Sequence, residues 1–345
     1  MRDFNCSNCG QELSFENSVC LQCNSPLGFS LAEKALVVIG KPADPTAPAG
    51  ITGEVDAEKF RLCDNLHLAR CNWLVAVEDE EGLCPSCRLT TTRPNNDDVD
   101  ALAAFADAEA AKRRLVLELV ELGLPIVDRE EDPDNGLAFE LLSSREENVI
   151  TGHVNGVITL DLAEGDDVHR EQLRVSMAEP YRTLLGHFRH ETGHYYFTVL
   201  VTTDDDRARF EELFGDPDAD YQDALDRHYS QGAPDGWEAN YVSSYATMHA
   251  AEDWAESFAH YLHIRDALDT AAAFGFAPAG ATFERHVPGQ AGFDKIIELW
   301  LPLAWALNMV NRSMGHKDLY PFVLPEPVLE KMRFIHDLVV AAQTG

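Results

Sequence analysis

The sequence predicts an α+β protein in which small cysteine-rich modules precede a mainly α-helical domain with a small antiparallel sheet. Three observations predict this class. All eight cysteines of the 345-residue chain lie between Cys6 and Cys87. Two runs rich in β-branched residues flank Asn155-Gly156, and such an arrangement is typical of a hairpin. Long helix-forming segments with capping residues make up much of the remainder.

The composition limits the possible partners and the location. With 27 basic and 59 acidic residues, the net charge of −32 argues against binding to nucleic acid or to an anionic membrane surface. No uninterrupted apolar stretch reaches the roughly 18 residues of a transmembrane helix. The residues from Met1 to Cys6 lack an apolar signal-peptide region. We therefore expect a cytoplasmic protein, in which cysteines bind metal more often than they form disulfides.

The first module is expected at residues 1–30 and contains two Cys-x-x-Cys pairs, with the ligands Cys6, Cys9, Cys20 and Cys23. Two such pairs supply four thiolates, the usual ligand set of a structural zinc ribbon. So short a segment would depend on the metal for much of its folding free energy. Redox-active cysteine pairs are the alternative. The segment contains one basic residue, Arg2, and three acidic residues, Asp3, Glu12 and Glu16. This charge balance favours a scaffold or a protein-docking surface over nucleic-acid binding.

A second four-cysteine zinc module is expected at residues 31–94. Its ligands would be Cys63, Cys71, Cys84 and Cys87. Only the last two form a standard knuckle, so His67 remains an alternative ligand. The two cysteine sets could also interleave, and the spacing alone leaves this open.

Residues 95–345 are expected to form the main domain. Asn95 to Asp98 offer N-caps for a long helix that ends before Gly123. The hairpin around Asn155-Gly156 follows, and its edge strand could pair with an extended substrate, with a plain structural hairpin as the alternative. We interpret His153 in this hairpin as an ordinary strand histidine.

The main chemical signal is the His190-Glu191-x-x-His194 motif, on a helix expected to start near Pro180. Positions i and i+4 share one helix face, so both imidazoles can bind one zinc ion, with Glu191 as general base. Gly193 lowers helix propensity, and we expect that it allows a strand or the substrate to approach closely.

A third zinc ligand is required, because catalytic zinc sites usually have three protein ligands and a water. Glu252 and Glu256 lie on one stripe of a predicted helix over residues 250–264. We predict that Glu252 binds the metal and that Glu256 accepts a hydrogen bond from a ligand histidine. Reversed roles, or His260 as the ligand, remain open. Tyr245 and His249 are candidate donors to the oxyanion that develops during peptide hydrolysis.

Other segments complete the predicted domain. Acidic residues 203–240 are interpreted as an insertion that covers the cleft between the two ligand-bearing helices. Residues 293–315, with Pro302 inside, and residues 326–341 are expected to be further helices.

Together these motifs resemble a bacterial family of zinc-binding metallopeptidases with an N-terminal zinc-ribbon domain. The resemblance extends over nearly the whole chain and includes the cysteine knuckles, Arg189-His190-Glu191-Thr192-Gly193-His194 and the segment from Glu252 to His263. It implies a zincin-like catalytic domain. We therefore predict a zinc peptidase with one catalytic and two structural zinc ions and a peptide or protein substrate. The alternative is a non-catalytic protein that docks partners through its zinc ribbons.

Overall fold

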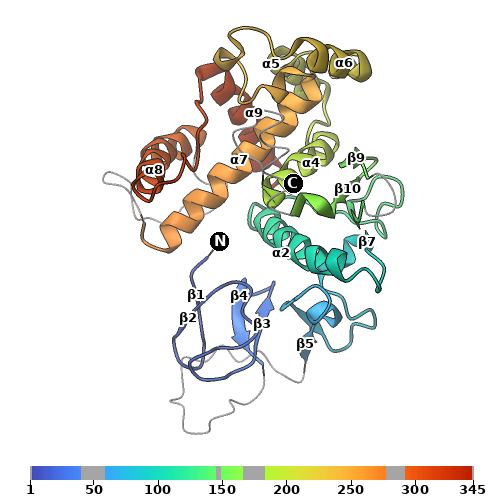
Figure 1. Cartoon of the computed structure of the whole chain (residues 1–345), viewed down its shortest axis with the longest axis vertical. Coiled ribbons are helices and arrows are strands. Elements are labelled where there is room, and N and C mark those ends of the chain that lie inside the picture. Colours follow the sequence, from blue (N-terminus) through green and yellow to red (C-terminus); the bar gives the residue numbers. More distant parts are fainter. Residues whose placement is uncertain (1, 40–58, 145–148, 166–182, 277–291, 344–345) are drawn as a thin grey trace.

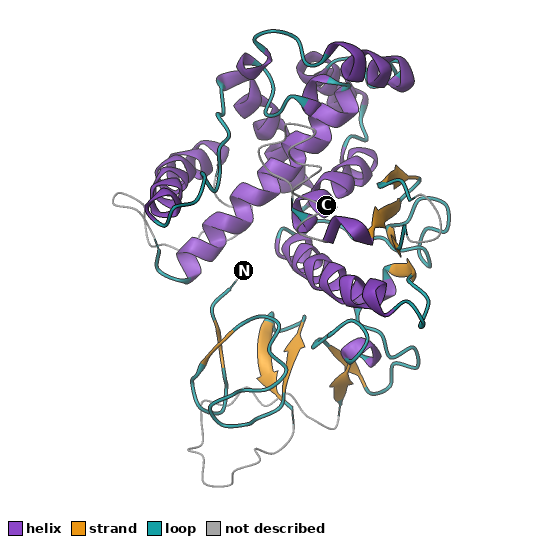
Figure 2. Ribbon diagram, in the orientation of Figure 1, coloured by secondary structure: helices purple, strands orange, loops and turns teal. Residues whose placement is uncertain are grey.

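The computed structural model describes residues 2–39, 59–144, 149–165, 183–276 and 292–343. Strand-rich modules formed by the N-terminal part lie at one end, and the helices gather at the other (Figures 1 and 2). The predicted class, a cysteine-rich N-terminal region followed by a mainly helical domain with small sheets, is confirmed. None of the described helices is long and apolar enough to span a membrane.

The N-terminal region consists of short antiparallel strand pairs. They are β1 (Phe4–Asn5) with β2 (Glu12–Leu13), β3 (Leu27–Ser30) with β4 (Ala35–Val38), and β5 (Phe60–Leu62) with β6 (Leu74–Ala76). The β3–β4 hairpin joins the two sides of the expected boundary at residue 30. Phe29 of β3 packs against Trp73, with ring centroids 5.1 Å apart, and its N–H donates to the Asn72 carbonyl (2.7 Å). The two cysteine modules therefore share buried aromatic side chains.

Helix α2 (Val99–Glu121) connects these modules to the rest of the chain. The Asp98 carboxylate caps it by accepting from the Ala101 N–H, and Gly123 follows it with a φ of +67°. Glycine adopts this left-handed conformation without a Cβ clash, so it stops the helix where the sequence predicted.

The small sheet has the strand order β7-β8-β10-β9, formed by β7 (Thr90–Thr92), β8 (Ala138–Leu142), β10 (Val157–Asp161) and β9 (Gly152–Val154). The hairpin predicted around Asn155-Gly156 is confirmed as β9–β10, and β9 is an edge strand. The sheet is mixed, however, because β8 pairs in parallel with both β7 and β10. The expectation of a purely antiparallel sheet was wrong because helix α2 connects β7 to β8, and such a crossover returns the chain in the same direction.

The remaining long helices are α4 (Leu184–Leu200), α5 (Asp204–Phe214), α6 (Tyr221–Gln231), α7 (Ala250–Ala273), α8 (Phe293–Ser313) and α9 (Glu326–Ala342). The predicted C-terminal helices are thus confirmed, with Pro302 inside α8. The predicted helix start at Pro180 lies outside the described residues. Within them α4 begins at Leu184, capped by the Thr183 hydroxyl, which accepts from the Gly186 N–H.

Helices α4 and α7 pack closely, and Gly193 makes this possible. A Cβ atom at residue 193 would lie 3.0 Å from the Ala255 Cα and 3.3 Å from the Phe258 Cβ. The Trp254 indole N–H donates to the Gly193 carbonyl (2.8 Å). Gly193 therefore admits the neighbouring helix, and the expectation that it admits a strand or the substrate was wrong. Close contact at this point brings together the polar faces of both helices.

Candidate metal centres and active site

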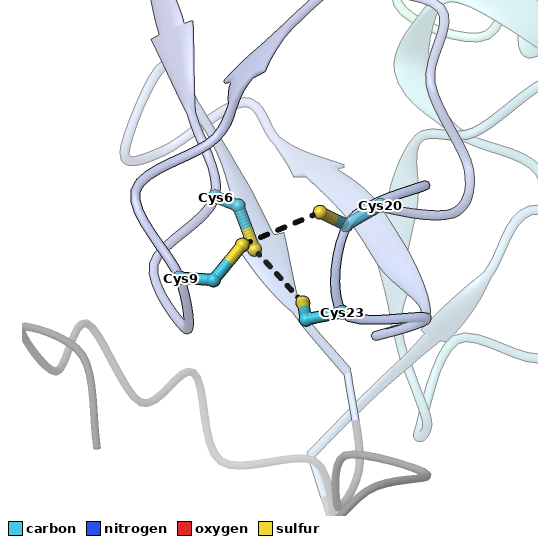
Figure 3. Close-up of side chains that lie close together, drawn as sticks. All are labelled: Cys6, Cys9, Cys20 and Cys23. Carbon is cyan, nitrogen blue, oxygen red and sulfur yellow. Dashed lines mark hydrogen bonds between the residues drawn. The ribbon is translucent and has the colours of Figure 1, made fainter. Parts of the chain in front are cut away.

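The first cysteine cluster consists of Cys6, Cys9, Cys20 and Cys23, whose side chains point toward one another (Figure 3). The sulfurs of Cys6 and Cys23 are 3.7 Å apart, and those of Cys9 and Cys20 are 3.6 Å apart. Four sulfurs about 2.3 Å from a tetrahedral zinc ion would be separated by about 3.8 Å. These two separations are close to that value, so the cluster suits a structural zinc ion.

The second cluster consists of Cys63, Cys71, Cys84 and Cys87, all buried. The sulfurs of Cys71 and Cys84 are 3.6 Å apart. Backbone N–H groups of Cys84 and Cys87 donate to the sulfurs of Cys63 and Cys84, both at 3.4 Å, which favours thiolates. The two cysteine sets do not interleave, and the exposed His67 is not part of this cluster.

Helix α2 contributes buried charges beside the second cluster. The Glu109 carboxylate lies 3.8 Å from the Cys87 sulfur and 2.7 Å from the Lys112 ammonium, and both charged side chains are fully buried. Arg113 donates to the Ala69 carbonyl (3.0 Å). Lys112 balances the charge of Glu109, and the Arg113 guanidinium, whose charge lowers the pKa of Cys71, can offset part of the negative charge of a four-thiolate zinc site.

A third group of possible metal ligands lies between α4 and α7. It consists of His190, His194 and Glu252, whose donor atoms all lie within 4.8 Å of one another. The Glu252 carboxylate oxygens are 3.0 Å from His190 Nε2 and 3.5 Å from His194 Nε2. Ligands about 2.0–2.1 Å from a tetrahedral zinc ion are separated by about 3.3 Å, so this group also fits the metal.

Glu256 lies one turn after Glu252 on α7 and contacts the other side of the same imidazole. Its carboxylate is 2.7 Å from His190 Nδ1, so His190 Nε2 is directed toward Glu252. Burial alone would raise the pKa of Glu256, but the hydrogen bond and charge of His190 lower it to about 2. Burial also disfavours a protonated His190, yet hydrogen bonds to Glu252 and Glu256 raise its pKa well above the ordinary value. The site therefore favours a positive charge between these groups.

His260, the alternative ligand, is placed elsewhere. Its Nδ1 atom lies 2.8 Å from the Tyr320 hydroxyl, and it is not part of the metal-ligand group. The structure thus places the Glu252 carboxylate beside Nε2 of both His190 and His194, and the Glu256 carboxylate beside His190 Nδ1.

Glu191 lies on α4 between the two histidines and lines a cavity of about 340 Å³. Its side chain is buried, and burial raises the pKa of its carboxyl group, whereas the nearby His190 and His194 lower it. A carboxylate in this environment is poised to accept and return a proton.

The two candidate oxyanion donors are placed differently. Tyr245, in a short 3₁₀ helix (Tyr245–Thr247), lines the cavity, with its ring 6.1 Å from that of His190. Burial, followed by the charge of Glu252, raises its pKa, so the phenol remains protonated. His249 instead caps α7 by accepting from the Ala251 N–H (3.1 Å), and its other ring nitrogen faces the Ala219 carbonyl (3.0 Å). These contacts hold His249 in a structural position.

Sequence reasoning missed Tyr221, the first residue of α6. Its hydroxyl donates to the Glu252 carboxylate (2.9 Å) and is hydrogen-bonded to Tyr245. The acidic insertion was expected to cover the cleft, which pointed to this segment but to no particular side chain.

A second missed pair lines the cavity wall. His187 Nδ1 lies 3.3 Å from the Glu164 carboxylate, which also accepts from the Thr151 hydroxyl (3.3 Å). His187 precedes Glu191 by one helical turn, so a cavity-facing position could be read from its spacing. Its partner Glu164 lies after β10, distant in the sequence, so the pairing could not be predicted from the spacing.

The β9–β10 hairpin lies beside the metal-ligand group. The ring of His153 in β9 is stacked parallel to that of His194 at 6.3 Å. The backbone N–H of Gly156 donates to His153 Nε2 (3.0 Å), and burial lowers the pKa of His153 to about 4. His153 is not part of the metal-ligand group, and it holds the hairpin turn next to the site.

Comparison with known proteins agrees with this arrangement. Residues 101–338 match the family described as "Putative zinc-binding metallo-peptidase", and residues 3–98 match a zinc-ribbon domain family. Uncharacterized proteins of Mycobacterium bovis and Mycobacterium tuberculosis are 66% identical over 340 residues, covering 98% of this chain and 95% of theirs. No solved structure matches the chain. The chain therefore belongs to the zinc-binding metallo-peptidase family and carries an N-terminal zinc-ribbon region.

Proposed function

We propose that the protein is a zinc-dependent peptidase whose catalytic zinc is held by His190, His194 and Glu252. The convergence of these three side chains, beside a cavity that His190 and Glu191 line, is the observation that carries the proposal. A bound zinc ion supplies a Lewis acid that lowers the pKa of water toward about 7 and polarises a peptide carbonyl. With three protein ligands, the fourth position of a tetrahedral site is left for water or substrate.

The residues of the chain have separate roles in this proposal. Glu191 accepts a proton from the attacking water and passes it to the leaving amine, so that one carboxylate serves both steps. Glu256 accepts a hydrogen bond from His190 Nδ1, which fixes the imidazole with Nε2 toward the metal position. Tyr245 is the oxyanion donor favoured by the geometry, since it lines the cavity and His249 is engaged in capping.

The substrate is proposed to be a peptide or an unfolded protein segment. Strand β9 is at the edge of its sheet and packs against α4, where an extended peptide could add as a further strand. The strongly negative charge favours neither nucleic acid nor anionic membranes as partners, and we propose a cytoplasmic location. The cysteine modules are proposed to be structural and available to protein partners.

The proposal is tested with Glu191→Gln, which removes the base but retains the shape of the side chain. Zinc-loaded wild-type protein is incubated with a peptide mixture, and the products are identified by mass spectrometry. We expect the variant to lose about 10²–10⁴-fold in cleavage rate while its zinc content stays unchanged. Glu298→Gln changes an exposed glutamate on α8 and serves as the matched control.

Equal cleavage by wild type and Glu191→Gln would contradict the mechanism. Cleavage by neither protein, with all three sites loaded, would favour the non-catalytic alternative in which the zinc ribbons dock partners.

A further inference from the structure

The cavity continues beyond the metal-ligand group, along the groove between α4 and α7. Its lining beside His190 includes Glu191 and Tyr245, and its lining further along α7, which we call the far end, includes Ala259, His260 and the Phe322 ring packed on His260. His260 follows Glu252 by eight residues on α7, which corresponds to about 12 Å along the helix axis. A residue next to the scissile bond would need a large side chain to reach this far end.

We propose that the far end of this cavity is a subsite that selects an aromatic side chain in the residue adjoining the scissile bond. The inference rests on the proposed peptidase function and specifies its substrate class.

Aromatic rings form and support this end of the cavity. The ring of His260 meets that of Phe322 edge to face, with centroids 4.3 Å apart. Tyr320 is hydrogen-bonded to His260 and packs edge to face against buried Trp300 at 4.9 Å. His263 is stacked on Tyr320 at 5.5 Å. Aromatic rings prefer edge-to-face or offset-stacked contacts, and this wall offers a further ring such contacts.

The charges around the far end are compensated or suppressed. Burial lowers the pKa of His260 to about 4 and that of His263 to about 3, so both imidazoles are neutral near pH 7. The Arg189 guanidinium, which also lines the cavity, pairs with Glu118 (2.9 Å) and Asp266 (2.7 Å). Among the described residues that line this end, an aromatic side chain therefore meets neutral imidazoles and a guanidinium that is paired with carboxylates.

The cavity is also lined by carboxylates that a basic side chain could approach, of which Glu191 and Glu256 lie beside His190 and Glu164 lies beside His187. Glu164 is paired there with His187 and accepts from Thr151. A basic side chain would have to compete with these contacts, whereas an aromatic one leaves them intact. We therefore favour the aromatic side chain and treat the basic one as an outcome of the test.

The size of the effect follows from burial. Full burial of a phenylalanine side chain is worth about 1.5–3 kcal/mol, which corresponds to about 10–150-fold in affinity. A substitution at Ala259 can remove this gain in affinity, because a larger side chain there would occupy the subsite and leave the metal ligands unchanged.

The test measures binding to the zinc-loaded protein by calorimetry, which is independent of turnover. The probes are N-acetylated hydroxamates of phenylalanine, alanine and lysine, since a hydroxamate binds an open zinc position. We expect phenylalanine hydroxamate to bind at least about 10-fold more tightly than alanine hydroxamate. Ala259→Leu should abolish this difference by lowering the affinity for phenylalanine hydroxamate. Ala272→Leu, on the exposed side of α7, is the matched control and should change neither affinity.

Equal affinities of wild type for the phenylalanine and alanine probes would overturn the inference and leave the proposed peptidase intact. Tightest binding of the lysine probe would overturn it in favour of a carboxylate of the cavity lining as the determinant. Failure of every hydroxamate to bind protein that holds three zinc ions would overturn the open catalytic site and this inference with it.

Discussion

The cysteine clusters and the histidine–glutamate group use their ligands in different ways. Each cysteine cluster brings four sulfurs from one short stretch of chain to the separations that zinc requires. The group between α4 and α7 brings together three donors from two helices, with Glu252 58 residues after His194, and one of the donors, His190, lines a cavity. Four ligands complete a tetrahedron and stabilise a fold, whereas three leave a position for chemistry. This difference supports our proposal that the cysteine clusters stabilise the fold and that the three-ligand group carries the chemistry.

The largest effect is expected from removing thiolates of the second cluster. In Cys84→Ser/Cys87→Ser we expect loss of one zinc ion and of much of the binding free energy, which is about 10–16 kcal/mol for structural zinc. Hydrogen exchange should increase in the strands of this module and in the middle of α2, because Glu109 and Lys112 lose their buried surroundings.

Glu191→Gln provides the contrast, since it should leave exchange in this region unchanged. Unaltered exchange in the double-serine variant would show that the cluster is not structural.

A smaller effect is expected from Glu256→Gln, which changes the orientation of a ligand and keeps the ligand itself. The amide can still contact His190 Nδ1 but carries no charge, so zinc affinity at the three-ligand site should fall about 10–100-fold. Competition with a chelator measures this affinity. Zinc in the cysteine clusters should be retained, and Glu298→Gln should behave as wild type. Equal weakening of all three sites would indicate a general loss of structure instead.

The smallest effect is expected from Gly193→Ala, which tests the contact between the two ligand-bearing helices. The added methyl group would lie 3.0 Å from the Ala255 Cα, and such overpacking typically costs about 1–3 kcal/mol. Thermal unfolding should show a lower Tm, by about 2–4 °C per kcal/mol for a domain of this size. Gly152→Ala, where no atom lies within 4 Å of the new Cβ, is the control. An unchanged Tm would mean that α4 and α7 adjust freely.

Local sequence signals predicted much of the architecture because the responsible interactions are local. Asp98 and Gly123 delimit α2, and Asn155-Gly156 turns the β9–β10 hairpin, as their backbone preferences require. The i, i+4 spacing likewise placed His190 and His194 on one face of α4, and it singled out Glu252 and Glu256 on α7.

Other features depend on tertiary packing and could not be predicted in this way. The parallel pairing of β8 with β7 arises from the crossover through α2. The neighbour of Gly193 was predicted wrongly, because only the packing of α4 against α7 shows that Ala255 and Phe258 approach it. Tyr221 reaches Glu252 from a segment whose sequence indicated only an acidic cover. In each case the missing information was the identity of a partner distant in sequence.

The most direct test of the difference between the two regions is the zinc content per chain, measured by elemental analysis on wild type and Glu252→Ala. The account predicts three zinc ions in the wild type, of which two belong to the cysteine clusters and one to His190, His194 and Glu252. It predicts two in the variant, with the cysteine-rich region still folded. Two zinc ions in the wild type, or three in the variant, would contradict the assignment of an open catalytic zinc site between α4 and α7.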